Sequence, residues 1–200
     1  SLQKKIEEQH SGDWRLATGD SLIGKTAIVT SGPTNEPIDP VRFLGNRSSG
    51  KQGHAIAKAL ADAGASVTLI TGNVSIPAPA GMASVIPVES AESMLEAVTK
   101  ALPADIFVAA AAVADWRPAI TSVKKLKKQN ALDTLTLEFI PTVDVLASIC
   151  VHAKRPALVV GFAAETENLI EYARTKLLKK NCDWIVANDV SGGQVFGEET

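Results

Sequence analysis

The sequence predicts an α/β fold, a doubly wound and mostly parallel sheet between two layers of helices. Short apolar runs of strand length alternate with helical patterns from residue 27 to residue 187. Most of these runs are continuously apolar, which is typical of strands that are buried on both faces. Apolar residues make up 46% of the 200 residues, enough for one sizeable core.

The first half of the chain is expected to supply three strands and two helices. Residues 27–31 form the first buried strand, and after a long loop residues 53–63 carry Ala and Ile at helical packing positions. Further strands are expected at residues 66–71 and 84–88. The next helix begins at Ser90, whose surroundings resemble a capping box.

The second half continues the same alternation. Residues 105–113 form an apolar strand that ends in small side chains, and a helix is expected at residues 144–152. Residues 157–162 and 184–187 read as strands on either side of a helix at 167–180. Because ligands of such sheets bind beyond the carboxyl ends of the strands, the Rossmann-like arrangement places any site at that edge.

Two segments depart from this rhythm. Residues 116–139 contain the basic stretch 124–128 and then an alternating pattern, which predicts a protruding β-excursion rather than a strand of the central sheet. Residues 1–24 combine a short charged helix candidate with a Gly- and Ser-containing stretch, and we expect them to be a linker to an upstream domain. Residues 25–200 are then the second domain.

The bulk composition excludes several classes of protein. A net charge of -2 and an aromatic content of 4% argue against a nucleic-acid or membrane-surface binder. Cys150 and Cys182 have no CxxC spacing, which fits a reducing compartment. No signal peptide and no apolar run of about 18 residues is visible, so we expect a cytoplasmic location.

The loop at residues 31–51 is the most informative segment. It joins a strand to a helix through many Gly, Ser, Asn and Arg residues, and loops longer than about 12–15 residues are usually functional or disordered. Ser48, Ser49, Gly50 and Lys51 would present hydroxyl and backbone donors at a helix N-terminus, which suits phosphate.

Two near-matches to the P-loop are rejected. Residues 19–26 have its spacing but precede a strand, and residues 45–52 end in Gln52 where Mg²⁺ requires a hydroxyl. No GxGxxG fingerprint is present, and no acidic residue ends the strand at 66–71, which argues against a nicotinamide-dependent reductase.

The small-residue strand end from Ala109 to Asp115 could admit a flat ligand close to the backbone. Asp115 could hold a metal ion or an exocyclic amine, or it could simply be a turn residue beside tight helix packing. Lys176 and Lys180 lie one helical turn apart on one face, either as ligands or as partners of the helix dipole. Phe162 could be a stacking partner but is more typical of a core residue.

The sequence lacks the residue patterns of zinc sites and of nucleophilic catalysis. The three histidines are scattered, no zinc spacing is present, and there is neither a GxSxG elbow nor a Cys–His arrangement. The basic stretch at Lys124, Lys125, Lys127 and Lys128 could fold over a polyphosphate or be a solvated turn. These observations favour catalysis by positioning and charge neutralisation, as in nucleotidyl transfer.

Together these segments resemble the phosphopantothenate–cysteine ligase family, the ligase half of the bifunctional coenzyme A biosynthesis protein of bacteria. The resemblance rests on residues 30–42, 46–51, 111–117, 125–128, 160–166 and 187–190, in order along the chain. It implies CTP-dependent ligation of 4′-phosphopantothenate with L-cysteine through an acyl-cytidylate, with Mg²⁺ as cofactor. It also implies a homodimer joined through the excursion, and FMN only in an upstream decarboxylase domain that is not in this chain.

The resemblance also assigns roles by position. Lys125 matches the residue needed to form the acyl-cytidylate, and Asn46 matches the amide implicated in its turnover, with Arg42 nearby. The substrate-binding set implied by the resemblance is Arg42, Ser48, Ser49, Gly50 and Ala112. The nucleotide-binding set is Gly32, Ala109, Ala110, Ala111, Asp115, Val143, Asp144, Val145, Leu146, Phe162, Lys176 and Lys180, with Asp115 as the metal candidate.

The chain also departs from the family. It reads Thr142-Val-Asp144 where the family has Asn-Pro-Asp, and it ends soon after Phe196 where relatives continue, so we expect a truncated C-terminus. A noncatalytic nucleotide-binding module is therefore the alternative hypothesis.

Overall fold

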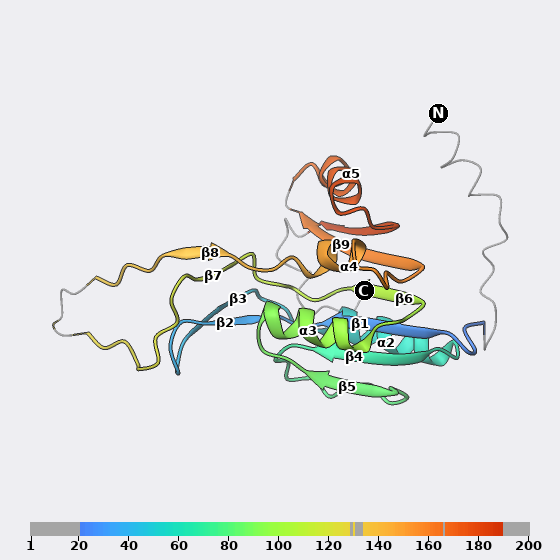
Figure 1. Cartoon of the computed structure of the whole chain (residues 1–200), viewed down its shortest axis with the longest axis horizontal. Coiled ribbons are helices and arrows are strands. Elements are labelled where there is room, and N and C mark those ends of the chain that lie inside the picture. The colour runs from blue at the N-terminus through green and yellow to red at the C-terminus, as the bar shows by residue number, and fades with distance from the viewer. Residues whose placement is uncertain (1–20, 129, 131–133, 166, 190–200) are drawn as a thin grey trace.

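Six parallel strands form the central sheet of the computed structural model, in the order β10-β9-β6-β1-β4-β5 (Figure 1). They are β1 (Thr26–Ser31), β4 (Ser66–Thr71), β5 (Ser84–Pro87), β6 (Ile106–Ala109), β9 (Leu158–Glu165) and β10 (Trp184–Asp189). The structure describes residues 21–128, 130, 134–165 and 167–189. All six predicted strands of the sheet are confirmed. The helix predicted within residues 1–24 falls almost entirely outside the described residues.

Helices cover both faces of the sheet, as predicted. They are α2 (Lys51–Asp62), α3 (Ala91–Ala101), α4 (Val145–Cys150) and α5 (Leu169–Lys180). On one face Ile28 and Phe107 pack with residues of α3 and α4, and Leu177 of α5 joins them. On the other face Val29 and Leu69 pack with α2. Neighbouring residues of β1 thus point to opposite faces, and each face buries its own apolar cluster.

Helix α3 begins as its sequence predicts. Ser90 Oγ accepts a hydrogen bond of 3.2 Å from the amide of Ser93, and Ser93 Oγ accepts one of 2.9 Å from the amide of Ser90. The two hydroxyls satisfy two backbone donors that would otherwise lack partners, which stabilises such a helix end by about 1 kcal/mol.

The strand predicted at residues 105–113 is shorter than expected, because β6 ends at Ala109. Beyond it the backbone turns toward the end of β1. The amide of Ala110 donates to the carbonyl oxygen of Thr30 at 3.2 Å, and the amide of Ala112 donates to that of Gly32 at 2.9 Å. The small residues after Ala109 therefore line the sheet edge as a loop rather than extending the strand.

Two small antiparallel pairs stand beyond the carboxyl edge of the sheet. The long loop after β1 contains β2 (Asn35–Pro37) and β3 (Phe43–Gly45), a hairpin that the sequence analysis did not predict. The second pair, β7 (Trp116–Pro118) with β8 (Phe139–Pro141), forms the base of an arm that projects from the sheet (Figure 1). The protruding excursion is confirmed. Within the alternating pattern that ends at residue 139, only Phe139 belongs to β8.

No helix in the described part of the chain is long and apolar enough to cross a membrane.

Candidate functional site

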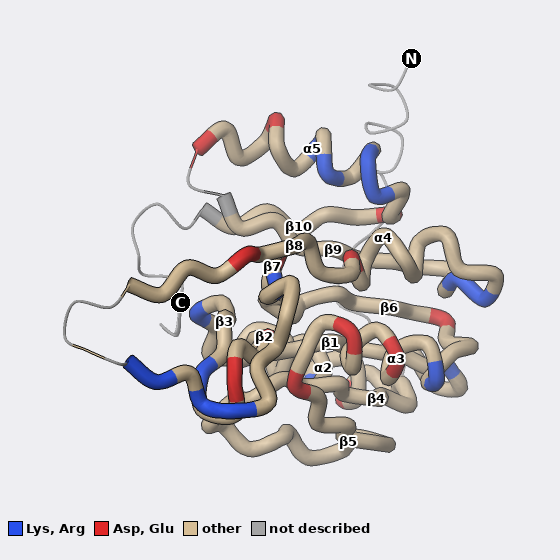
Figure 2. Tube along the Cα trace, turned by 60° about the vertical axis from the view of Figure 1, so that its left-hand side comes forward, with Lys and Arg blue, Asp and Glu red and all other residues tan. Residues whose placement is uncertain are grey.

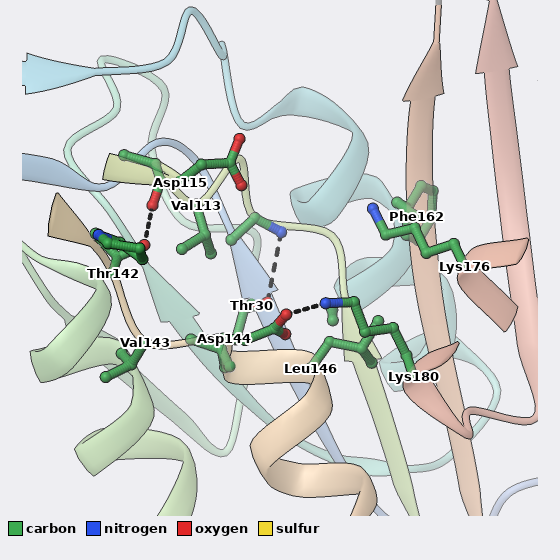
Figure 3. Close-up of a pocket in the computed structure, with 15 residues that line it drawn as sticks. Thr30, Val113, Asp115, Thr142, Val143, Asp144, Leu146, Phe162, Lys176 and Lys180 are labelled. Carbon is green, nitrogen blue, oxygen red and sulfur yellow. Dashed lines mark hydrogen bonds and ion pairs between the residues drawn. The ribbon is translucent and has the colours of Figure 1, made fainter. Parts of the chain in front are cut away.

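A cavity of about 330 Å³ opens at the carboxyl edge of the sheet, between the loop after β6 and helices α4 and α5 (Figure 3). This is the edge at which ligands of parallel α/β sheets bind. The cavity is lined by Thr30, Ala109, Ala111, Val113, Ala114, Asp115, Pro141, Thr142, Val143, Asp144, Val145, Leu146, Phe162, Lys176 and Lys180.

Small side chains form one wall of the cavity. Ala109, Ala111 and Val113 line it, whereas Ala110 and Ala112 do not. Ala110 packs instead toward the apolar cluster under α2. The amide of Ala111 donates to Thr30 Oγ1 at 3.4 Å, which fixes the wall against the end of β1 (Figure 3). The alternation leaves a flat surface in which no side chain is larger than valine.

Charged side chains also line the cavity. Lys176 and Lys180 of α5 both line the cavity, and Lys180 Nζ forms an ion pair with Asp144 Oδ2 (Figure 3). Asp144 also caps α4, because its Oδ1 accepts a hydrogen bond of 2.9 Å from the amide of Ala147. Burial alone would raise the pKa of Asp144, but the bonds from Lys180 and Ala147 outweigh it and lower that pKa below its ordinary value.

Phe162 and Asp115 occupy further parts of the lining. Phe162 is half-buried on β9 and also packs against the apolar cluster under α2, so it belongs to both core and cavity. Asp115 is exposed at the rim. Its carboxylate is thus available to a ligand that enters from solvent.

The N-terminus of α2 and the loop before it carry the predicted phosphate donors. Gly50 takes a positive φ of 75°, and its carbonyl oxygen accepts a 2.9 Å hydrogen bond from Ser31 Oγ. Ser48 Oγ accepts from the amide of Gly50 at 3.3 Å, and Ser49 Oγ accepts from the amide of Lys51 at 3.4 Å. These residues are not part of the cavity lining; they lie at the start of the helix that packs on the opposite face of the sheet.

Gly50 and Gly32 need to be glycine for two reasons. The first reason is the backbone, since Gly32, like Gly50, has a positive φ, of 73°. The second is space, because a Cβ at Gly32 would lie 2.6 Å from Val74 Cγ1 and a Cβ at Gly50 would lie 2.7 Å from the same atom. Gly32 does not line the cavity, but its carbonyl oxygen holds the amide of Ala112.

Asn46 connects this loop to the cavity wall. Its side-chain Nδ2 donates a hydrogen bond of 2.9 Å to the carbonyl oxygen of Val113, 67 residues away in the sequence. Val113 lines the cavity, so the amide of Asn46 sits at its rim.

Lys125 and Arg42 do not line the cavity of their own chain. Lys125 is exposed on the arm, and Arg42 pairs with Asp39 in the turn between β2 and β3. The sequence thus groups these residues with the site, whereas the single chain separates them from the cavity.

No group of three or more His, Cys, Asp or Glu side chains that could hold a metal ion occurs among the described residues. Mg²⁺ does not require such a cage, since it commonly binds through one or two carboxylates together with substrate phosphates. Asp115 at the rim fits that type of donor set.

Val113 and Ala114 belong to the predicted small-residue stretch from Ala109 to Asp115, whereas sequence reasoning missed three residues of the lining, namely Thr30, Pro141 and Thr142. Thr30 could have been found, since a threonine near the end of an apolar strand offers a hydroxyl at the ligand-binding edge. Thr142, the residue after β8, donates from Oγ1 to the carbonyl oxygen of Ala114, a contact with the wall that no local pattern indicates.

Comparisons with known proteins bear on this site. A sequence model of the family described as "DNA/pantothenate metabolism flavoprotein C-terminal domain" matches residues 22–200. The chain is 49% identical over 177 residues to the coenzyme A biosynthesis bifunctional protein CoaBC of Vibrio cholerae, which covers 88% of this chain and 44% of that protein. It is 46% identical over 198 residues to the CoaBC protein of Bacillus subtilis, covering 98% of this chain and 47% of that protein.

A solved structure is also similar. The crystal structure of the C-terminal domain of a CoaBC protein matches with a TM-score of 0.74 and 42% identity, covering 86% of this chain and 81% of that one. The chain spans about half the length of the curated relatives it matches.

Proposed function

The chain belongs to the DNA/pantothenate metabolism flavoprotein C-terminal domain family, and we propose that it is a phosphopantothenate–cysteine ligase acting in coenzyme A biosynthesis. In the proposed reaction a carboxylate oxygen of 4′-phosphopantothenate attacks the α-phosphorus of CTP, and the bond to pyrophosphate breaks. The amine of L-cysteine then attacks the acyl carbon, the bond to CMP breaks, and the amide forms with loss of a proton.

One observation carries this proposal. The small residues Ala109 and Ala111 line the same cavity as Lys176 and Lys180, at the carboxyl edge of the sheet. A flat base can lie against small side chains, while lysines neutralise phosphate oxygens as charge develops on them. Curated relatives at 46% identity and above carry the name of a coenzyme A biosynthesis protein, which supports the same reaction.

Specific residues receive roles in this proposal. Asp115 would hold Mg²⁺ that is chelated by the triphosphate, and that ion would neutralise the phosphate charge. Asn46 would orient the acyl group of the intermediate from the cavity rim, where it already donates to Val113. The backbone amides at the N-terminus of α2, beside Gly50, would donate hydrogen bonds to phosphate oxygens.

Lys125 is proposed to act on a neighbouring copy of the chain in a homodimer. It does not line the cavity of its own chain, and its arm projects away from the sheet (Figure 1). Apolar side chains on the arm and on the β2–β3 hairpin are exposed in the single chain, among them Ile120 (84%), Val123 (89%) and Phe43 (55%). Exposed apolar surface of this kind is typical of a protein interface.

The noncatalytic nucleotide-binding module remains the second candidate, because the cavity of one chain lacks Lys125. Pyrophosphate release separates the two. The ligase releases pyrophosphate from CTP only when phosphopantothenate is present, releases CMP only after cysteine is added, and uses ATP poorly. Tight CTP binding without pyrophosphate release under these conditions would favour the binding module.

A further inference from the structure

Asp39 is a carboxylate without exposed side-chain surface, in the turn between β2 and β3. Its Oδ1 accepts hydrogen bonds of 2.9 Å from the amides of Val41 and Arg42. Its Oδ2 accepts from Nε and Nη2 of Arg42 and, at 3.0 Å, from the amide of Leu126. The bond from the Arg42 guanidinium outweighs the effect of burial and holds the pKa of Asp39 well below its usual range, so the carboxylate stays charged.

The contact with Leu126 is the one that reaches furthest along the chain. Leu126 lies on the arm, 87 residues after Asp39. Both polar atoms of its backbone are held, because its carbonyl oxygen also accepts a hydrogen bond of 2.7 Å from Arg42 Nη2. Asp39 and Arg42 therefore both bind the backbone of the same residue, Leu126: Asp39 at its amide and Arg42 at its carbonyl oxygen.

Two further bonds fasten the arm to the same turn. Thr121 Oγ1 donates to the carbonyl oxygen of Pro37 at 3.1 Å, and the amide of Ser122 donates to that of Ile38 at 2.9 Å. Figure 2 shows the basic stretch of the arm (blue) passing beside β2 and β3. The buried Asp39 is the charged member of this attachment.

Lys125 directly precedes Leu126. The amide nitrogen of Leu126 and the carbonyl group of Lys125 belong to one planar peptide group, so a bond to that nitrogen also fixes the backbone direction at Lys125. The basic side chains around it, Lys124, Lys125, Lys127 and Lys128, are all exposed.

We infer that Asp39 is a positioning residue, which holds the backbone at Leu126 and so sets the place at which Lys125 is presented to the nucleotide. The inference rests on the proposed function of the chain, since it gives Asp39 a role through Lys125. A local role predicts something different: Asp39 would then only order its own turn, through Val41 and Arg42, and the arm would not respond to its loss.

Limited trypsin digestion tests the attachment without any activity assay. In Asp39→Asn the segment at Lys124–Lys128 should be cleaved on the order of tenfold faster than in the parent, because local opening exposes the backbone. Asp105→Asn is the matched control. Asp105 also accepts hydrogen bonds from a residue that is distant in the sequence, through the amide and Oγ1 of Thr26, but it lies at the other end of the sheet. Equal cleavage of the arm in all three proteins would overturn the inference.

A second variant covers the case in which Asp39→Asn does not fold. Leu126→Pro removes the backbone N–H that donates to Asp39 and leaves the Asp39–Arg42 pair intact. Leu126 is half-buried and belongs to neither apolar cluster. Cleavage after Lys127 should again be faster by a similar factor. An unchanged rate in this variant would contradict the attachment.

Pyrophosphate release tests whether the attachment acts through Lys125. Asp39→Asn should slow release, and adding it to Lys125→Gln should slow release no further, because two residues that act as one unit are non-additive. Fully additive losses would show that Asp39 acts elsewhere. If the parent itself releases no pyrophosphate, the proposed function fails and the positioning role with it, while the cleavage rates still decide whether Asp39 holds the arm.

Discussion

The side chain of Asn46 donates a hydrogen bond of 2.9 Å to the carbonyl oxygen of Val113. This single contact joins the loop after β1 to the wall of the cavity, two segments that the sequence places 67 residues apart. It holds the amide of Asn46 against Val113, a residue that lines the cavity.

Asn46→Asp should therefore let the acyl-cytidylate accumulate. An aspartate cannot donate to Val113 and brings a negative charge beside an anionic intermediate. In a single turnover with all substrates, pyrophosphate should appear at nearly the parental rate while CMP release falls by at least tenfold, about 1.4 kcal/mol. Parallel release of both products at parental rates would make Asn46 a structural residue only.

Lys125→Gln should block the first step instead. Removing one charge that stabilises the developing negative charge of a transition state costs about 2–4 kcal/mol, so the burst of pyrophosphate should fall roughly 30- to 900-fold. Lys100→Gln, on the exposed face of α3, is the control and should leave the burst unchanged. A normal burst in the Lys125 variant would refute its role.

Complementation tests whether Lys125 acts across a dimer. In a heterodimer of Lys125→Gln and Asn46→Asp, one of the two sites would have a normal Asn46 and a normal Lys125 from the partner. Coexpression should then restore about a quarter of the parental rate, since half of the dimers are mixed. No restoration in mixed dimers isolated by two affinity tags would assign Lys125 to its own chain.

Ala111→Leu should close the cavity to the nucleotide. The side chain of Ala111 faces the cavity, and three further carbon atoms would occupy space that a base needs. We expect the KM for CTP to rise by tenfold or more with little change in melting temperature. Ala80→Leu, at an exposed loop position, serves as the control. An unchanged KM would mean that the base binds elsewhere.

His54 makes stability depend on pH. Burial, only partly offset by the backbone of Gly50, lowers the pKa of His54 below its ordinary value of 6.5. The unfolded chain therefore binds this proton more readily. The contribution to stability is complete above about pH 6.5, and as the pH falls the free energy of unfolding decreases by at most about 1.4 kcal/mol per unit.

His54→Phe should flatten this part of the pH profile, and the half-exposed His152→Gln should not. Denaturant unfolding at pH 5, 6 and 7 measures both. Identical slopes in the parent and in His54→Phe would contradict the burial argument. Nε2 of His54 is buried without a hydrogen-bond partner in the described residues, which agrees with a neutral imidazole.

The sheet could be predicted from the sequence because its strands are continuous apolar runs whose order along the chain follows the α/β alternation. The capping of α3 by Ser90 could also be predicted, because it depends on two residues only three positions apart in the sequence. The end of β6 at Ala109 could not be read from neighbouring residues, because the amides of Ala110 and Ala112 donate to Thr30 of β1 and to Gly32 just after it.

The residues of the candidate site were likewise predictable only in part from the sequence. Ala109, the last residue of β6, could be placed at the cavity because the carboxyl ends of parallel strands share one edge. The attachment of Leu126 to Asp39 could not be predicted, since a hydrogen bond between two loops leaves no periodic signal. For the same reason the sequence did not reveal that Lys125 lies outside the cavity of its own chain.

A crystal structure with CTP and Mg²⁺ tests the central claim most directly. The base should lie against Ala109 and Ala111, with the triphosphate between Lys176, Lys180 and the start of α2 at Gly50. Density for the nucleotide at any other surface, with this cavity holding only solvent, would contradict the proposal.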